Sequence, residues 1–344
     1  MNPTTTLLIL SSLATGTIIT ASSFHWFMAW IGLEMNTLAI VPIISKQHHP
    51  RATEAATKYF LTQAAASALI LFSSMMNAWQ SGMWDITQPT NQTSSILLTV
   101  AIAMKLGLAP SHFWLPEVLQ GTTMTTALII STWQKLAPMT LMCLTMNNLS
   151  STTLILMGTL STCLGGWGGI NQTQTRKIMA YSSIAHLGWM ATISTMMTNL
   201  MLLNLAIYML MTTSMFTMLI LTKSKTIQNM TTTWALSPTL TVTALLTLLS
   251  LAGLPPLSGF MPKWLIINEL INQNLIITTS VMTMSTLLSL FFYLRLTYTT
   301  SLTLAPSTPN TTYKWRLTPN PSLPLTTTIP GSLLTLPITP ILTQ

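Results

Sequence analysis

Long runs of apolar residues, separated by short polar stretches, fill almost the whole chain. A helix needs about 20 apolar residues to cross a bilayer, and the pattern predicts eleven such spans. They cover residues 3–22, 25–45, 54–80, 94–119, 123–145, 149–169, 175–197, 199–222, 238–272, 274–298 and 324–342. Because the connections are short, neighbouring helices are expected to be antiparallel, and neither strands nor a soluble domain are predicted. The longest connection, 299–323, is rich in Pro, Thr and Asn and is expected to be an extended surface segment.

Two of the predicted spans, 94–119 and 238–272, are interrupted by prolines. These are Pro110 and Pro116 in the first span, and Pro255 and Pro256 in the second. Both stretches contain Gly-Leu-x-Pro followed by a Phe and a further Pro. A proline removes a helical N–H and leaves a carbonyl oxygen without its usual donor. Interrupted helices at matching places in two halves of a membrane protein indicate a transporter core.

The composition fits a membrane protein and argues against several other functions. Only 5% of the 344 residues are charged, against about 25% in soluble domains, and 49% are hydrophobic. The 13 basic residues outnumber the 5 acidic ones, but they form no basic run that would bind nucleic acid. Cys143 and Cys163 stand alone in apolar runs, so no metal or iron–sulfur site is expected. The first residues are predicted to open a span, not a cleaved signal.

The positions of the basic residues agree with this topology. Nine of the 13 fall in or near loops on the side where the topology places the N-terminus. They are Lys46, Arg51, Arg176, Lys177, Lys223, Lys225, Lys314 and Arg316, with Arg295 close to the same side. The opposite loops hold no Lys or Arg, and Asp85 lies there. Because Lys and Arg accumulate on the cytoplasmic side or its organellar equivalent, the N-terminus is predicted to lie on that side.

The remaining four basic residues fall within predicted spans and are candidates for proton transfer. They are Lys58, Lys105, Lys135 and Lys263. Lys105 precedes the first helix break and Lys263 follows the second one, while Lys135 lies deep in the span after the first break. Ionisable residues at this depth are costly and usually functional, and a lysine away from water is suited to releasing and regaining a proton. For Lys263, an ion pair with Glu269 is the alternative.

Glu34 is the only acidic residue near the middle of an uninterrupted predicted span. We expect it to face Lys58 from the next span. Such a pair, about 4 Å apart at an effective dielectric of about 20, is worth roughly 4 kcal/mol, which changes how tightly the lysine holds its proton. In the alternative arrangement, Lys58 extends toward water and pairs with Glu54, one helical turn earlier.

Two histidines also lie within predicted spans. His186, in the middle of 175–197, is predicted to relay protons, with an ordinary buried histidine as the alternative. His112 lies in the first helix break and is expected to bond carbonyl oxygens released by the prolines. Glu117 follows the same break and is left without a role.

The order of these features closely resembles that of the antiporter-like membrane subunits of respiratory complex I. The resemblance covers nearly the whole chain, and the stretches Lys105–Pro116 and Leu251–Lys263 are its most specific part. It implies that a glutamate and several lysines in the middle of the membrane form a proton-transfer axis, and that a further lysine pairs with the glutamate. The residues that match the axis are Glu34, Lys105, Lys135 and Lys263, and the residue that matches the partner is Lys58.

The same resemblance implies the organisation of the whole chain. It predicts an all-α polytopic protein with one membrane domain, 1–344. Within it, 1–145 and 149–298 would be inverted five-helix repeats, and 299–344 would hold the surface segment and the final span. The sequence similarity between the two interrupted spans is imperfect, because Lys105 precedes the first helix break whereas Lys263 follows the second one.

The resemblance further implies a subunit of a proton-pumping complex that oxidises NADH and reduces ubiquinone. The chain is expected to bind no cofactor itself, while NADH, FMN, iron–sulfur clusters and ubiquinone are used elsewhere in the complex. Expected partners are other membrane subunits and lipids, not nucleic acid or a second copy of the chain. The expected location is the mitochondrial inner membrane, with the N-terminus in the matrix. The alternatives are a stand-alone cation/proton antiporter subunit and a structural spacer without a proton path.

Overall fold

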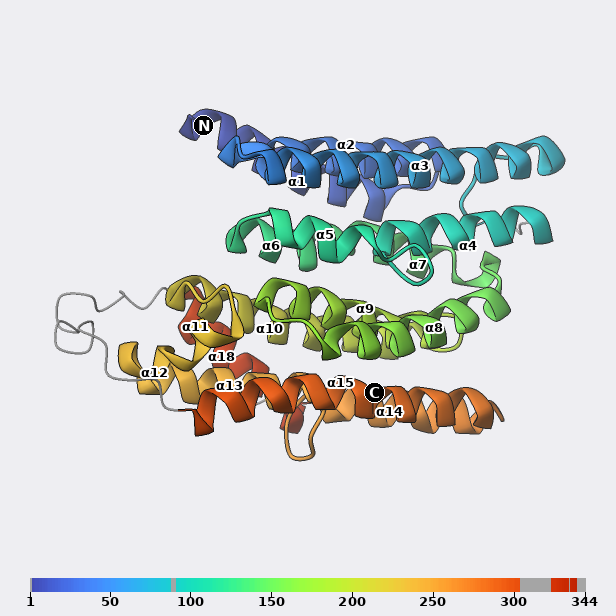
Figure 1. Ribbon diagram of the computed structural model, residues 1–344. Coiled ribbons are helices and arrows are strands. Elements are labelled where there is room, and N and C mark those ends of the chain that lie inside the picture. Colours follow the sequence, from blue (N-terminus) through green and yellow to red (C-terminus); the bar gives the residue numbers. More distant parts are fainter. Residues whose placement is uncertain (1, 88–90, 304–322, 334, 339–344) are drawn as a thin grey trace. The chain divides into compact units, whose positions relative to one another are not determined.

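The computed structural model describes residues 2–87, 91–303, 323–333 and 335–338 (Figure 1). These residues form helices and short connections, with two isolated bridges and no extended strand among them. Seven described helical segments, among them the interrupted Met124–Leu144, are long and apolar enough to cross a membrane. Two shorter apolar helices, α4 (Gln92–Leu106) and α13 (Pro238–Ala252), accompany them. The predicted all-α membrane fold is confirmed, and the count of eleven spans stays a prediction.

The chain divides into two compact units, and the first consists of residues 1–161 and 191–198. Its elements are α1 (Pro3–Ser22), α2 (Trp26–Ile44), the 3-10 helix η1 (Ser45–Gln47), α3 (Pro50–Ser81), α4, α5 (Trp114–Gly121), α6 (Met124–Ser131), α7 (Trp133–Leu144), η2 (Met146–Asn148) and the start of α8 (Ser151–Ile170). Here α2 packs against α1 and α3, while α3 also contacts α4 and α5.

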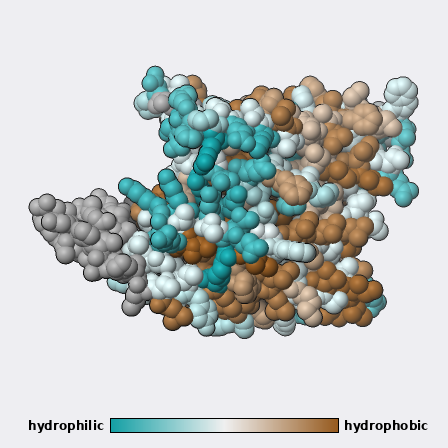
Figure 2. Space-filling view, in the orientation of Figure 1, coloured by the Kyte–Doolittle hydropathy of each residue, from teal (hydrophilic) through white to brown (hydrophobic). Residues whose placement is uncertain are grey.

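Figure 2 shows apolar side chains over much of the visible face of α1–α3, with hydrophilic ones gathered toward one end. Such a surface suits contact with lipid.

The second unit consists of residues 162–190 and 199–344. Its elements are the rest of α8, most of α9 (Thr175–Ile193), α10 (Thr198–Thr222), α11 (Ile227–Thr231), α12 (Thr233–Leu236), α13, α14 (Phe260–Asn272), α15 (Ile276–Leu302), α18 (Leu323–Leu333) and η3 (Leu336–Ile338). Within it, α15 packs against α13 and α14, and α18 packs against α13. The close approach of α8 to α15 needs a glycine, because a Cβ at Gly169 would lie 2.7 Å from the Phe292 ring.

Both predicted helix breaks are confirmed, and they have the same backbone design. Gly107 ends α4 with φ +82°, and Gly253 ends α13 with φ +83°. In each case the glycine N–H donates to carbonyls three and four residues earlier, and the next N–H donates five residues back. This left-handed helix end favours glycine because a Cβ would be strained there. The interrupted spans therefore consist of α4 with α5 and α13 with α14.

A pair of connecting loops also recurs in the two units. In the first unit, the Trp26 N–H donates to the Trp84 carbonyl and the Ile86 N–H to the Phe24 carbonyl, around a bridge between residues 25 and 85. The same two bonds recur in the second unit around a bridge between residues 174 and 226. In the predicted topology these loops lie on opposite sides of the membrane. This match supports the inverted repeats 1–145 and 149–298, which stay a prediction.

Three predicted segments differ in detail or lie partly outside the described residues. The predicted continuous span 123–145 is interrupted at Thr132, whose backbone leaves helical geometry at φ −114° and ψ −75°. No glycine or proline occurs at this position, so the sequence does not predict the interruption. The predicted final span 324–342 begins with α18, and residues 334 and 339–342 lie outside the described part. Of the segment 299–323, residues up to Leu302 extend α15, and 304–322 are not described.

Candidate functional site

Lys105 is held at the first helix break, in the last turn of α4. The left-handed Gly107 ends that helix two residues later. The Lys105 side chain is 6% exposed, and no described residue accepts a hydrogen bond from its ammonium nitrogen. An unsatisfied buried polar group costs about 1–3 kcal/mol, and more when it is charged. Because burying Lys105 costs stability, its presence there indicates a role in function.

A small cavity of the first unit lies beside Lys105. Helices α2, α3, α4, α5 and α7 contribute its lining residues, which are Leu33, Asn36, Thr37, Tyr59, Gln63, Lys105, Trp114, Gln134, Ala137 and Pro138. The space open to the centre of a water molecule is about 10 Å³, close to what one water requires. Lys105 is the only charged residue in this lining.

Uncharged polar side chains connect the walls of this cavity. The Tyr59 hydroxyl donates to Gln134 Oε1 at 3.2 Å, and Gln134 Nε2 donates to the Asn36 carbonyl at 3.4 Å. Gln63 Nε2 lies 3.5 Å from the Lys105 carbonyl. The Asn36 side-chain amide is 2% exposed, and neither its nitrogen nor its oxygen has a hydrogen-bond partner among the described residues. Donors and acceptors that line a cavity of this size suit a water that both donates and accepts.

Glu34 lies in the middle of α2, as predicted, and is half-buried. Its Oε2 accepts a hydrogen bond from the Thr37 hydroxyl at 2.6 Å, and its Oε1 accepts one from the Ser67 hydroxyl of α3 at 2.7 Å. Thr37 also lines the cavity beside Lys105. The carboxylate is therefore fixed between two helices and connected to the cavity through Thr37.

The predicted contact between Lys58 and Glu34 is wrong. The Lys58 ammonium pairs with Glu54 at 2.5 Å and with Glu117 of α5 at 2.6 Å, and its side chain is 42% exposed. Ser67, which contacts Glu34, lies nine residues further along α3, which is about 13 Å along a helix axis. The long side chain keeps its charge in water, where an ion pair carries little desolvation cost. The alternative pairing with Glu54 is the one observed.

The contacts of Lys58 hold the half-helix α5 against α3. Its pair with Glu117 joins the two helices at their exposed edge. At Gly121 a Cβ would lie 2.7 Å from the α3 backbone, so the helices approach closely there. Tyr59 meets Trp114 edge to face, with ring centres 5.7 Å apart. Lys58 thereby helps to position Trp114 at the cavity, and its assignment to proton transfer stays a prediction.

Lys135 is buried and directly follows a lining residue of this cavity in the chain, with a side chain that is 4% exposed. It lies in the first turn of α7, three residues after the interruption at Thr132. The neighbouring Gln134 lines the cavity, and Pro138 cannot donate to the Gln134 carbonyl as a normal helical residue would. The predicted buried position of Lys135 is confirmed, next to a turn whose backbone is not fully paired.

Lys263 lies just after the helix break between α13 and α14 in the second unit. It lies in the first turn of α14, and its ammonium donates to the carbonyl of Ala252, the last residue of α13, at 2.9 Å. The side chain therefore reaches back across the break to a helix C-terminus, where the carbonyl groups carry partial negative charge. The alternative ion pair between Lys263 and Glu269 is not formed.

The two histidines of the predicted spans are both buried. His186 of α9 is 5% exposed, and its ring centre lies 5.5 Å from that of Tyr208 of α10. His112 in the first break is 4% exposed, and its Nδ1 lies 3.2 Å from the Pro110 carbonyl. His112 thus contacts a carbonyl of the break, but it is that of Pro110 itself, whereas the prolines release the carbonyls of Leu106 and His112. The relay role of His186 stays a prediction.

Sequence reasoning missed the uncharged part of the site. The missed residues are Asn36, Tyr59, Gln63, Trp114 and Gln134. A signal was available for three of them, since Asn and Gln within apolar spans are costly unless their amides are bonded. Among the described residues, no group of three His, Cys, Asp or Glu could hold a metal ion. The chemistry that this arrangement offers is proton transfer among amines, a carboxylate, hydroxyls and water.

Comparisons with known proteins agree with this architecture. The family model described as NADH:quinone oxidoreductase/Mrp antiporter, transmembrane, matches residues 23–289, and that of the NADH dehydrogenase subunit 2 C-terminus matches residues 290–343. The chain is 57% identical over 345 residues to NADH-ubiquinone oxidoreductase chain 2 of Varanus timorensis, with 100% of both proteins covered.

Two solved structures have a similar fold. A chain of respiratory complex I from Thermus thermophilus with bound aureothin has a TM-score of 0.88 at 25% identity, with 98% of this chain and 79% of that chain covered. A chain of the Mrp complex from Dietzia sp. DQ12-45-1b has a TM-score of 0.78 at 16% identity, with 84% of this chain and 59% of that chain covered. The second likeness concerns the fold alone.

Proposed function

The chain belongs to the NADH:quinone oxidoreductase/Mrp antiporter transmembrane family, and from this premise we propose how its own side chains move protons. It is a multi-pass, antiporter-like subunit of the membrane arm of proton-pumping complex I. Lys105 takes up and releases a proton at the polar cavity, with Glu34 as the charge that controls it. The observation that carries this proposal is the buried Lys105 ammonium, which lacks a hydrogen-bond partner in the described chain beside a water-sized space.

We assign the further steps within each unit to the other ionisable residues of the predicted spans. In the first unit, Lys135 exchanges protons near the cavity. In the second unit, Lys263 and His186 do so beside the helix break and the Tyr208 ring. A lysine can serve in this way because an environment away from water disfavours its charged form, so that it can release and regain a proton.

Two other functions use the same fold. A stand-alone cation/proton antiporter subunit would exchange Na⁺ or K⁺ for protons, and the match to a family model whose description includes the Mrp antiporter is its support. That support is weaker than the full-length identity to subunits of NADH-ubiquinone oxidoreductase. A structural spacer would not need a buried, unpaired amine, because an apolar residue in its place would cost less.

We propose that the chain has the cofactor use, the partners and the cellular location that its resemblance to complex I subunits implies. The chain binds no cofactor, and NADH, FMN, iron–sulfur clusters and ubiquinone act in other parts of the complex. Its partners are other membrane subunits and lipids, without nucleic acid and without a second copy of the chain. The location is the mitochondrial inner membrane, with the N-terminus in the matrix.

Replacing Lys135 tests whether the chain moves protons. In the assembled complex, we expect both Lys135→Met and Lys135→Arg to lower proton uptake per NADH oxidised severalfold in proteoliposomes. Arginine keeps the positive charge but does not release its proton, so it should not restore transfer. Full pumping by both variants would favour the spacer, and Na⁺- or K⁺-dependent exchange by the wild-type chain would favour the antiporter.

Labelling of single cysteines tests the proposed orientation. We expect His49→Cys and Asn229→Cys to react with an impermeant maleimide in inverted vesicles, whose matrix side faces outward. Met83→Cys should react only in mitoplasts, because its loop lies at the other end of α3. All three residues are exposed. Reaction of Met83→Cys and Asn229→Cys from the same side would refute the topology.

A further inference from the structure

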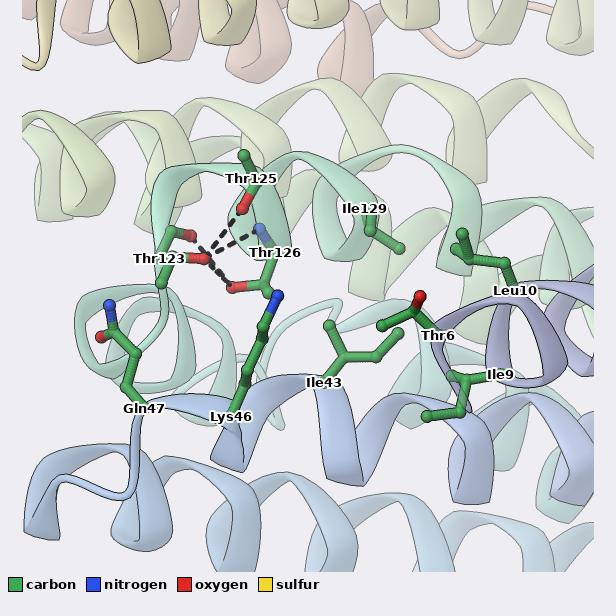
Figure 3. A pocket seen from close by; sticks show the side chains of 10 residues that line it. All are labelled: Thr6, Ile9, Leu10, Ile43, Lys46, Gln47, Thr123, Thr125, Thr126 and Ile129. Atoms are coloured by element: carbon green, nitrogen blue, oxygen red, sulfur yellow. Dashed lines mark hydrogen bonds between the residues drawn. The ribbon is translucent and has the colours of Figure 1, made fainter. Parts of the chain in front are cut away.

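A second cavity of the first unit, with a volume of about 440 Å³, lies where α1, α6 and the C-terminal end of α2 meet (Figure 3). Its lining residues are Thr6, Ile9, Leu10, Ile43, Lys46, Gln47, Thr123, Thr125, Thr126 and Ile129. None of them lines the cavity beside Lys105. The volume falls within the range of about 300–1,000 Å³ that is typical of sites for small molecules.

The lining of this cavity changes from polar to apolar along two helices. On α2 and η1, Lys46 and Gln47 lie at the helix end, and Ile43 lies about one turn deeper. Thr123 caps the start of α6, Thr125 and Thr126 lie in its first turn, and Ile129 follows about one turn deeper. Figure 3 shows the Lys46 side chain beside these threonines, with Ile43 and Ile129 displaced toward Ile9 and Leu10 of α1. The cavity therefore has a polar end and an apolar end.

The polar end is positively charged and rich in hydroxyl groups. Lys46 is the only charged lining residue, and none of the described Asp or Glu side chains pairs with it. The Thr123 hydroxyl lies 3.0 Å from the Thr125 hydroxyl and 3.1 Å from the Thr126 hydroxyl, which gathers the three groups at one place. The Thr126 hydroxyl also donates to the Thr123 carbonyl at 3.0 Å, as the Thr6 hydroxyl does to the Pro3 carbonyl at 2.8 Å, and the oxygen of each hydroxyl can still accept a hydrogen bond. A cation with clustered hydroxyls suits a phosphate ester that carries further hydroxyl groups.

The depth of the cavity in the membrane agrees with this chemistry. Its polar residues lie at the C-terminal end of the membrane-spanning α2 and at the start of the α6–α7 segment. At the ends of spanning helices the lipid headgroups begin, and basic residues there attract anionic lipids. The apolar residues lie toward the middle of the same helices, at the depth of the acyl chains.

We infer that this cavity binds one anionic phospholipid with a glycerol-type headgroup. Its phosphate contacts Lys46, its headgroup hydroxyls contact the threonine cluster and Gln47, and one acyl chain lies against Ile43, Ile129 and Leu10. A choline or ethanolamine headgroup fits less well, because its cation would meet Lys46 and no lining carboxylate. A free phosphate ion would leave the apolar end unused. The inference rests on the cavity alone and does not depend on the proton-transfer role.

The test uses the intact complex in nanodiscs with a phosphatidylglycerol that carries a diazirine on one acyl chain. After illumination, we expect cross-links to peptides that contain Leu10, Ile43 and Ile129. A phosphatidylcholine with the same chains should label them roughly fivefold less, which is the preference that one basic residue near an anionic headgroup gives. An excess of inorganic phosphate should not compete, whereas unlabelled phosphatidylglycerol should.

Two variants with matched controls locate the contacts. Lys46→Gln should reduce labelling by phosphatidylglycerol to the level of phosphatidylcholine, while Lys225→Gln, at an exposed lysine outside the cavity, should not. Ile43→Trp should fill the apolar end and reduce labelling by both lipids. Leu38→Trp adds the same ring to an exposed position of α2 outside the cavity and should leave labelling unchanged. A native gel confirms that each variant assembles, and the lipid competition in the wild-type complex gives a result that needs no variant.

Three results would overturn the inference. Equal labelling by the two lipids, unchanged in Lys46→Gln, would mean that lipid covers the cavity without selection. Absence of cross-links from either lipid, while other membrane helices are labelled, would mean that another polypeptide covers it. Competition by inorganic phosphate would mean that the polar end selects a free anion.

Discussion

Lys105→Met is expected to lower proton-coupled NADH oxidation by about 10²-fold, the lower end of what a positioned proton-transfer group contributes. Methionine has a similar length and removes the titrating amine. The variant should still assemble, because the Lys105 ammonium has no hydrogen-bond partner among the described residues, and removing such a buried group does not destabilise the fold. The measurements are NADH oxidation and proton uptake by the purified complex in liposomes, with assembly judged on a native gel.

Lys225→Met is the matched control for this prediction. Lys225 is exposed in the connection after α10, so the same change removes one charge without touching the cavity. We expect it to retain wild-type activity. Normal proton uptake in Lys105→Met would show that this lysine is not part of a proton path, and loss of assembly would show that its burial is structural.

Glu34→Gln is expected to lower the same coupled activity by at least about tenfold, in keeping with the functional cost attached to intramembrane acids. Glutamine has the same shape, and its amide can keep a hydrogen bond with both the Thr37 and the Ser67 hydroxyl. Only the charge is lost, and with it the control over Lys105 that we propose. Glu34→Asp should be intermediate, because the shorter carboxylate keeps the charge but cannot hold both hydroxyls.

A double-mutant cycle tests whether Glu34 and Lys105 act as one pair. If they do, Glu34→Gln combined with Lys105→Met should be no worse than Lys105→Met alone, since residues that act together are not additive. Ser67→Ala is the control, because it removes one hydrogen bond to Glu34 and keeps the charge. Full activity of Glu34→Gln, or equal activity of the Gln and Asp variants, would exclude charge at Glu34 as the controlling feature.

The pairing of Glu34 shows where sequence reasoning reached its limit. The apolar spans identified Glu34 and Lys58 as neighbours on consecutive helices, but sequence distance does not fix depth along the packed helices. In the structure, Ser67 stands opposite Glu34, and Lys58 lies nine residues away at the exposed edge with Glu54 and Glu117. The observed partners of the Glu34 carboxylate are instead the hydroxyls of Thr37 and Ser67.

The sequence by itself determined the features that depend on the bilayer and on local backbone chemistry. Lipid excludes charge and unpaired backbone, so long apolar runs predict spans, and Lys105, Lys135 and Lys263 stand out within them. The breaks at Gly107 and Gly253 were predictable because proline and glycine act on their own segment.

Only the tertiary structure decided which side chains meet. The cavity beside Lys105 joins Asn36, Gln63 and Gln134 from three different helices, and the interruption at Thr132 carries no glycine or proline. These features depend on how far each helix is rotated and shifted against its neighbours. That arrangement is set by packing between residues far apart in the chain, and a hydrophobic pattern read along one segment does not contain it.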